Sequence, residues 1–222
     1  MTSPGSLWLA ALLLVSAVTL PAQTPVQIGV AGGVAINDVV GDDTEGAESR
    51  TTGYFGGVLV WQPAGMVGFE TGIYYVPKGA EFNEDGVNGT IKLNYVEVPL
   101  LLRLALPISQ SPIRPVLTIG GAVAFKSSCD VEGEGGGVSV EIDCDEFFTL
   151  LEDEVGVKAE MQSVDYGVVA GLAVDFPAGE RMVISPSIRY VRGLRDILEI
   201  GGTSVDARNA GFQVGIALRL GI

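Results

Sequence analysis

The chain has 222 residues, of which 47% are hydrophobic and 18% charged, and it carries a net charge of −14. This charge argues against nucleic-acid binding, because neutralising phosphates requires clustered Lys and Arg. The absence of histidine excludes a Ser-His-Asp triad, a histidine metal site and a histidine general base.

The first element is an apolar segment over residues 7–20, followed by Pro21-Ala22-Gln23. A short apolar stretch ending before a small residue is typical of a secretory signal peptide, here with cleavage after Ala22. An N-terminal membrane anchor is the alternative, because no Lys or Arg precedes the apolar segment. We expect residues 1–22 to be a signal peptide and residues 23–222 to form one domain without a spanning helix.

Eight segments of the mature chain alternate between large apolar and small or polar residues, which indicates strands with two unlike faces. In the last segment every even position from Phe212 to Ile222 is large and apolar, and the odd positions are small or polar. Each segment is long enough to cross a bilayer at a tilt, which takes about nine to eleven residues. The segments are 26–36, 52–62, 66–76, 91–106, 115–126, 164–176, 182–191 and 211–222.

The connections between these segments alternate in length. Short connections lie near residues 63–65, 107–112 and 177–180, and long ones cover 37–51, 77–90, 127–160 and 192–208. Short turns at one rim and long loops at the other are typical of up-and-down outer-membrane barrels. The long loops hold 22 of the 27 acidic residues, so we expect acidic outer loops.

The small-residue face decides between a membrane barrel and a soluble, lipocalin-like ligand-binding barrel. This face is mostly Gly, Ala and Ser, which suits a narrow lumen better than an exterior exposed to water. The large apolar face would then contact outer-membrane lipid. We therefore predict an all-β protein: an eight-stranded antiparallel up-and-down transmembrane β-barrel in the outer membrane, with short periplasmic turns and long acidic outer loops.

Charges of both signs lie within the predicted strands. A buried charge persists only when it is paired, so a salt-bridged plug is expected rather than an open channel, with Glu70 and Glu97 pairing with Arg103 and Arg189. A catalytic Glu70–Glu97 pair is the less favoured interpretation. The strand charges are Glu70, Lys92, Glu97, Arg103, Asp165, Asp175, Arg189 and Arg219. The candidate lumen network consists of Glu70, Glu97, Arg103, Asp165, Arg189 and Arg219.

The third long loop contains both cysteines, Cys129 and Cys144, and eleven acidic residues. In an exported protein we expect a disulfide, which on the chain-entropy model stabilises by roughly 3 kcal/mol; a metal site is the rival interpretation. The carboxylates could bind Ca²⁺, but they lack EF-hand spacing, and a solvated, self-repelling loop is favoured. A short helix or an apolar tip over residues 147–155 that contacts a partner is a less favoured interpretation.

Aromatic residues lie near the strand ends, as in interfacial girdles. Tyr54 and Trp61 have opposite parity within one segment, so one faces inward or a bulge lies between them. Pro99 within a strand and a parity change near Asn94 predict a bulge in 91–106. The expected girdle residues are Tyr54, Tyr75, Tyr95, Phe125 and Tyr190 at the long-loop rim, and Trp61 and Phe176 at the short-turn rim.

Two neighbouring segments, GIYYVPKGAEF and IKLNYVEVPLLLRLALP, resemble the paired signature of the PorT-like outer-membrane β-barrel family. That signature is Gly-x-x-Tyr…Lys-Gly followed by Leu-x-Tyr-x-Glu-x-Pro-Leu-Leu-Leu-Arg. The resemblance implies an eight-stranded barrel in a Gram-negative outer membrane; it does not imply a reaction. The chain departs from such barrels by ending on Ile222, where an aromatic residue is usually read by the outer-membrane assembly machinery. The matching residues are Gly72, Tyr75, Lys78, Gly79, Leu93, Tyr95, Glu97, Pro99, Leu100, Leu101, Leu102 and Arg103.

The leading functional hypothesis is a non-enzymatic outer-membrane barrel with a plugged lumen and no cofactor. Its role would be structural, or exerted through contacts of the acidic loops with an unidentified surface or periplasmic protein. A small pore or a transport- or secretion-associated barrel is the alternative. A membrane-embedded hydrolase is disfavoured by the lack of histidine.

Overall fold

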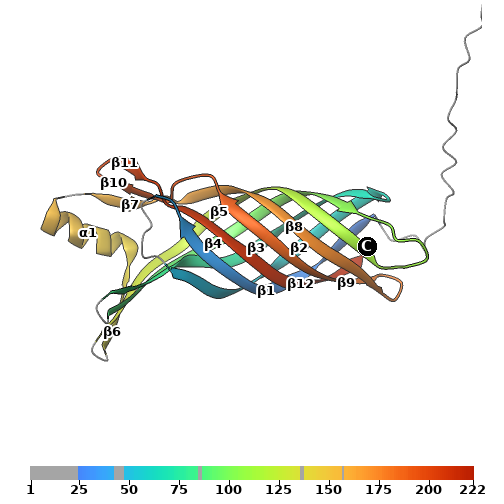
Figure 1. The fold of residues 1–222 in the computed structure, drawn as a ribbon, viewed down its shortest axis with the longest axis horizontal. Helices are drawn as coiled ribbons and strands as arrows, with labels where there is room; N and C mark the ends of the chain where they lie inside the picture. The colour runs from blue at the N-terminus through green and yellow to red at the C-terminus, as the bar shows by residue number, and fades with distance from the viewer. Residues whose placement is uncertain (1–24, 43–47, 85–86, 136–137, 157) are drawn as a thin grey trace, which may run out of the picture.

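A computed structural model describes residues 25–42, 48–84, 87–135, 138–156 and 158–222 (Figure 1). The predicted signal peptide, residues 1–22, lies outside the described residues. The elements in chain order are β1 (Val26–Val40), β2 (Glu48–Ala64), β3 (Val67–Glu84), β4 (Val87–Ala105), β5 (Arg114–Gly135), β6 (Val138–Asp143), α1 (Cys144–Val155), β7 (Ala159–Met161), β8 (Val164–Ala178), β9 (Met182–Gly193), β10 (Leu198–Ile200), β11 (Thr203–Val205) and β12 (Arg208–Gly221).

Eight of the described strands close into an antiparallel barrel (Figure 1). The order around the barrel is β1, β2, β3, β4, β5, β8, β9 and β12, and β12 pairs back onto β1. At this seam Ile28 pairs with Leu220 and Val34 with Val214. Each barrel strand therefore lies next to the barrel strands that precede and follow it, and the predicted eight-stranded up-and-down barrel is confirmed.

The alternation in the sequence sorts side chains between the outside and the inside of the barrel. In β12, Ile216 is 52% exposed, whereas Arg219 is 1% exposed. Leu100 of β4 and Ile119 of β5 are also largely exposed on the outside. An apolar belt around a closed barrel is the surface that hydrocarbon covers in a bilayer.

Three tyrosines, Tyr54, Tyr74 and Tyr95, fill the interior beside the small residues. A Cβ at Gly215 would lie 2.3 Å from the Tyr54 hydroxyl oxygen, so glycine leaves space for this ring. The assignment of Tyr54 and Tyr95 to the outer girdle is therefore wrong. A lumen lined by small side chains has space that rings from the facing strands occupy.

The outer aromatic residues lie at both rims, as expected for the remaining girdle. Near the short turns, Trp61 faces outward and stacks on Phe69 of the neighbouring strand, with ring centroids 5.9 Å apart. Near the long loops, Tyr190 packs against Phe212. The opposite parity of Tyr54 and Trp61 is thus explained by Tyr54 facing inward.

The predicted bulge lies in β5 rather than in β4. Asn94 pairs with Ser128 and Tyr95 with Lys126, which leaves Ser127 as the additional residue. The Ser127 hydroxyl donates a hydrogen bond to the Asn94 carbonyl at 3.0 Å. β4 itself keeps one parity, because an insertion in one strand of a pair shifts that strand alone.

Pro99 is accommodated within β4. The β3–β4 pairing skips from Thr71/Leu100 to Tyr74/Glu97 around Pro99, whose nitrogen has no hydrogen to donate. The Thr71 hydroxyl instead donates to the Pro99 carbonyl at 2.7 Å.

The long connections are largely folded. The β3–β4 and β5–β6 hairpins extend past the barrel, and β7, β10 and β11 form a separate three-stranded sheet. These elements and α1 gather at the end of the barrel opposite the C-terminus (Figure 1). Residues 127–160, expected as one loop, thus contribute a strand end, β6, α1 and β7.

The helix α1 is defined by its caps. The Asp143 side chain accepts a hydrogen bond from the Asp145 backbone nitrogen at 2.8 Å, and Gly156 ends the helix in the left-handed conformation with φ of 70°. Asp145 and Glu146 in the first turn complement the helix dipole. The helix therefore begins before the predicted 147–155. Within the described chain, no helix is long and apolar enough to cross a membrane.

Candidate functional site

Five charged side chains form one connected network in the barrel interior. Arg103 Nη2 donates to both carboxylate oxygens of Asp175, at 2.7 and 2.8 Å, and Arg103 Nε donates to Glu70 Oε2 at 3.3 Å. Arg189 also donates to Glu70, and Arg219 to Asp175. Because these residues come from β3, β4, β8, β9 and β12, the network joins strands on different sides of the barrel.

The network is buried and receives neutral partners as well. Gln62 Oε1 accepts from Arg103 Nη1 at 2.9 Å, and the Ser185 hydroxyl donates to Asp175 Oδ1 at 2.8 Å. All five charged residues are buried. Three arginines and two carboxylates give this group a formal charge of +1.

A second polar group lies nearer the long-loop end. Lys78 Nζ is 3.1 Å from Glu97 Oε2, and Gln213 Nε2 donates to Glu97 Oε1 at 3.5 Å. Asp165 Oδ2 accepts from Asn209 Nδ2 at 2.8 Å. All five side chains are buried.

The structure places all six candidate network residues in the interior, but in two groups. Glu70 contacts both of its expected partners, Arg103 and Arg189. Glu97 contacts neither of them and binds Lys78 instead. On β4, Glu97 lies six residues from Arg103, toward the long-loop end, where Lys78 of β3 is its partner.

Asp175 and Lys78 belong to these groups although the candidate set lacks them. Asp175 has the inward parity of β8, a signal already present in its alternation. Lys78 lies within residues 77–90, which the sequence predicts to be a loop. In the structure β3 continues through this position to Glu84. Of the strand charges, Lys92 is the one outside the interior: it lies on the hairpin extension, with Nζ 2.8 Å from Glu132 Oε2.

Lys92 lies outside the membrane-spanning part of the barrel, and its contacts change the pKa values of two side chains. Its hydrogen bonds to Glu132 and Glu141 raise the pKa of Lys92 above its ordinary value. The hydrogen bond from Lys92 lowers the pKa of Glu132. This ion pair stabilises the hairpin extension formed by β4, β5 and β6.

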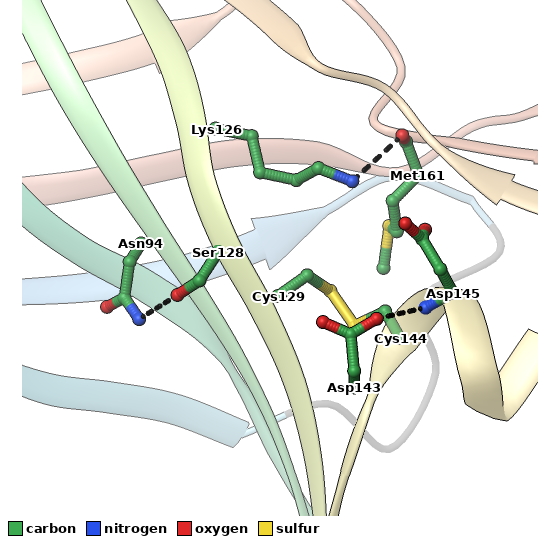
Figure 2. The surroundings of a disulfide bond; sticks show 8 residues. All are labelled: Asn94, Lys126, Ser128, Cys129, Asp143, Cys144, Asp145 and Met161. Atoms are coloured by element: carbon green, nitrogen blue, oxygen red, sulfur yellow. Dashed lines mark hydrogen bonds between the residues drawn. A yellow bond between two sulfur atoms is a disulfide. The ribbon is translucent and has the colours of Figure 1, made fainter.

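A disulfide joins Cys129 of β5 to Cys144 at the start of α1, with their Cα atoms 5.4 Å apart, so the predicted pairing is confirmed (Figure 2). Both cysteines belong to an apolar cluster that includes Leu93 and Ala124 of the barrel wall. Lys126 Nζ donates to the Met161 carbonyl at 3.2 Å in the same region (Figure 2). The cluster therefore fastens α1 and β7 to the long-loop mouth of the barrel. Its buried members are Leu93, Tyr95, Ala124, Cys129, Cys144, Met161, Ile197 and Ala207.

The carboxylates of residues 130–160 are distributed over β5, β6, α1 and β7. In the described part of the chain, no group of three or more His, Cys, Asp and Glu side chains is arranged to hold a metal ion.

Comparison with known proteins places this geometry in a family. A family model described as the outer membrane protein beta-barrel domain matches residues 21–199. The crystal structure of the outer membrane protein OprG from Pseudomonas aeruginosa is similar with a TM-score of 0.50 and 13% identity, covering 91% of this chain and 96% of that chain. A search of curated proteins finds no match.

Two further barrels show weaker likeness. The Escherichia coli outer membrane protein W has a TM-score of 0.49 and 12% identity over 90% of this chain and 100% of that chain. Neisserial surface protein A has a TM-score of 0.47 and 10% identity over 88% and 97%. At these identities the structural likeness shows the fold alone, whereas the family match covers most of the sequence. The chain, with its closed barrel and apolar belt, belongs to the outer membrane protein beta-barrel domain family and is an outer-membrane protein.

Proposed function

We propose that this protein is a non-enzymatic outer-membrane barrel with a plugged lumen, which acts through the surface of its outer end. The observation that carries the proposal is the network of Glu70, Arg103, Asp175, Arg189 and Arg219, whose ion pairs connect facing strands across the interior. Large side chains held in this way occupy the path that a pore would need.

Three layers support the plug. The first layer is the arginine network, which lies toward the short turns. The second consists of the buried rings of Tyr54, Tyr74 and Tyr95, and the third is the apolar cluster around the disulfide at the outer mouth. Two cavities lie between the polar side chains of the second group, the one around Lys78, Glu97 and Asp165. Each measures about 10 Å³, which is near the smallest volume that holds one water molecule. A hydrated ion does not pass through such spaces without rearrangement.

The non-enzymatic assignment is supported by how the interior carboxylates are held. Glu70 and Asp175 each contact two arginines, so the oxygens of both carboxylates are engaged in ion pairs within the interior. The chain also has no histidine to act as a general base near neutral pH.

The outer end supplies the surface for interaction. Acidic residues are exposed on α1, including Glu146, Glu152 and Asp153. The apolar side chains of Leu150 on α1 and Val140 on β6 are also exposed. An acidic surface attracts basic partners at long range, and exposed apolar residues add short-range contact. The partner is therefore proposed to be a basic protein surface.

We also propose that the chain is a PorT-like member of its family. Two signature residues, Lys78 and Glu97, form an ion pair, and Arg103 is the centre of the interior network. The signature thus consists partly of lumen contacts. In an alignment of PorT-like sequences, substitutions at the position of Lys78 should be coupled to substitutions at the position of Glu97. Independent variation of the two positions would contradict the assignment.

Planar-bilayer recordings test the plug. Purified protein should insert without conductance steps, while an open porin added to the same bilayer gives them. Regular steps from the wild-type protein would contradict the plugged lumen.

Binding to immobilised polylysine tests the surface role. A variant with Glu146→Gln, Glu152→Gln and Asp153→Asn should bind more weakly than wild type. Glu180→Gln at the short-turn end is the matched control and should bind as wild type does. Equal binding by all three proteins would contradict an interaction through the acidic outer end.

A further inference from the structure

The two interior groups carry opposite unpaired charge. Eight charged side chains are buried among the described residues, four acidic and four basic. Five of them form the arginine network with its excess of one positive charge. The remaining three are Lys78, Glu97 and Asp165, and they leave an excess of one negative charge nearer the outer end.

Asp165 carries that excess. Lys78 is paired with Glu97, whereas Asp165 Oδ2 accepts a hydrogen bond from a neutral group, the Asn209 amide. Asp165 is 3% exposed, and its other oxygen, Oδ1, has no hydrogen-bond partner. A buried carboxylate oxygen without a donor or a cation is unfavourable, so the site favours a positively charged or donating ligand.

The space beside Asp165 has the size of a single small ligand. A cavity of about 10 Å³ is lined by Asp165, Glu97 and Lys78, together with small residues that include Gly193. A Cβ at Gly193 would lie 3.4 Å from Asp165 Oδ1 and 2.8 Å from the Asn209 carbonyl oxygen. Glycine at this position therefore keeps the space next to the carboxylate open.

The unsatisfied atoms around this chamber are acceptors. Asn209 Oδ1 has no partner, like Asp165 Oδ1, and Asn209 lines a second cavity of about 10 Å³ that shares Lys78 and Val191 with the first. The neighbouring arginines are directed to backbone carbonyls: Arg50 donates to the Lys78 carbonyl at 2.7 Å, and Arg195 to the Val164 carbonyl at 3.0 Å. Oxygen acceptors with one uncompensated negative charge suit a hard cation of charge +1.

We propose that this chamber binds one small monovalent cation of the Na⁺ or K⁺ class, with Asp165 as its charged ligand. A divalent ion is a poorer match, because the chamber provides one uncompensated charge and the described residues contain no set of three metal-ligating side chains. The bound cation compensates the excess negative charge of the group around Asp165, while the arginine network keeps its excess of one positive charge. The inference rests on the interior geometry and is independent of the proposed surface role.

Thermal unfolding of the purified full-length mature protein in detergent tests the proposal. The midpoint is measured at constant ionic strength in LiCl, NaCl, KCl, CsCl and N-methyl-D-glucamine chloride. A ligand that binds the folded state alone raises stability with its concentration, so the midpoint should rise saturably with one of the small cations and not with the organic cation. Equal midpoints in all five salts would overturn the proposal.

The variant Asp165→Asn should lose this cation dependence while remaining folded, because the amide is neutral and similar in shape. Asp153→Asn, on the exposed face of α1, is the matched control and should keep the dependence. Dependence that persists unchanged in Asp165→Asn would place the cation elsewhere and overturn the assignment.

Crystals of the wild-type protein soaked in thallium(I) acetate provide a measurement that needs no variant. An anomalous peak within ligand distance of Asp165 Oδ1 is expected. A water molecule at that position without anomalous signal would overturn the proposal.

Discussion

Arg103 and Asp175 are joined by a contact of one guanidinium nitrogen with both carboxylate oxygens, at 2.7 and 2.8 Å, although β5 separates their strands. The contact therefore runs through the interior, not along a ladder of neighbouring strands. Glu70 and Arg219 extend it to β3 and β12. Side chains thus tie the barrel wall together across its lumen, in addition to the backbone hydrogen bonds around it.

The substitution Arg103→Leu should lower the free energy of unfolding by about 3 kcal/mol, because it leaves Asp175 and Glu70 each with one arginine fewer in a buried site. Equilibrium unfolding of the folded barrel in urea measures the change. Arg181→Leu, at an exposed position near the short turns, is the control and should change the value little. Similar effects of the two substitutions would show that Arg103 is solvated.

Gly79→Ala should destabilise the β3–β4 hairpin by about 1–3 kcal/mol, since φ values well above zero are strained for residues with a Cβ. Gly79 has φ of 122°, and a Cβ there would lie 1.9 Å from the Ile91 carbonyl oxygen. Gly133→Ala is the control, because a Cβ at Gly133 meets nothing within 4 Å. Thermal unfolding should separate the two variants; equal midpoints would contradict the strain at Gly79.

The intact, non-reduced protein should show no reactive thiol, because Cys129 and Cys144 form a disulfide. Reduction should make the segment around α1 cleavable by protease, while the barrel keeps the gel mobility of an unboiled, folded protein. The replacement Cys129→Ser with Cys144→Ser should behave like the reduced protein. Ready labelling of both thiols in protein taken from the cell envelope would contradict the disulfide.

Trp61 should be quenched by brominated lipid. If residues 1–22 are removed, Trp61 is the remaining one of the two tryptophans, and it is 45% exposed in the girdle near the short turns. Lipids brominated near the headgroup should quench its emission more than lipids brominated near the chain end. Stronger quenching by the deep label would place Trp61 away from the interface.

The Lys92–Glu132 ion pair should make the hairpin extension sensitive to pH. The folded-state pKa of Glu132 is lowered from 4.5, so this contact stabilises the fold above that value and is lost as pH falls through the lowered pKa. The pKa of Lys92 is raised from 10.5. On the alkaline side the stabilisation by the ion pair is therefore fully present below pH 10.5 and is lost as pH rises through the raised pKa.

NMR titration of the Glu132 carboxyl carbon measures the shift. In Lys92→Met the pKa of Glu132 should move back toward its ordinary value. Lys158→Met, which removes a lysine from the neighbourhood of Glu160, is the control. An unchanged titration of Glu132 in Lys92→Met would contradict the ion pair.

The sequence alone determines the barrel, because period-two alternation records which face of each strand meets lipid. The rows of apolar residues ending in Leu218, Leu220 and Ile222 have no other stable environment when the opposite face holds Gly215 and Arg219. The alternation of long and short connections likewise determines the up-and-down topology. Both signals are local, so they can be read without knowing which strands touch.

The tertiary structure alone decides which inward side chains meet. Glu97 and Arg103 share one face of β4, yet Arg103 joins Asp175 and Glu97 joins Lys78, because strand register and tilt set the height of each residue in the lumen. The parity of β4 already turns Tyr95 inward with Glu97 and Arg103, whereas the space for the Tyr54 ring is left by Gly215 of β12. Partner choice in a closed barrel is a relation between distant segments, and no pattern within a single strand contains it.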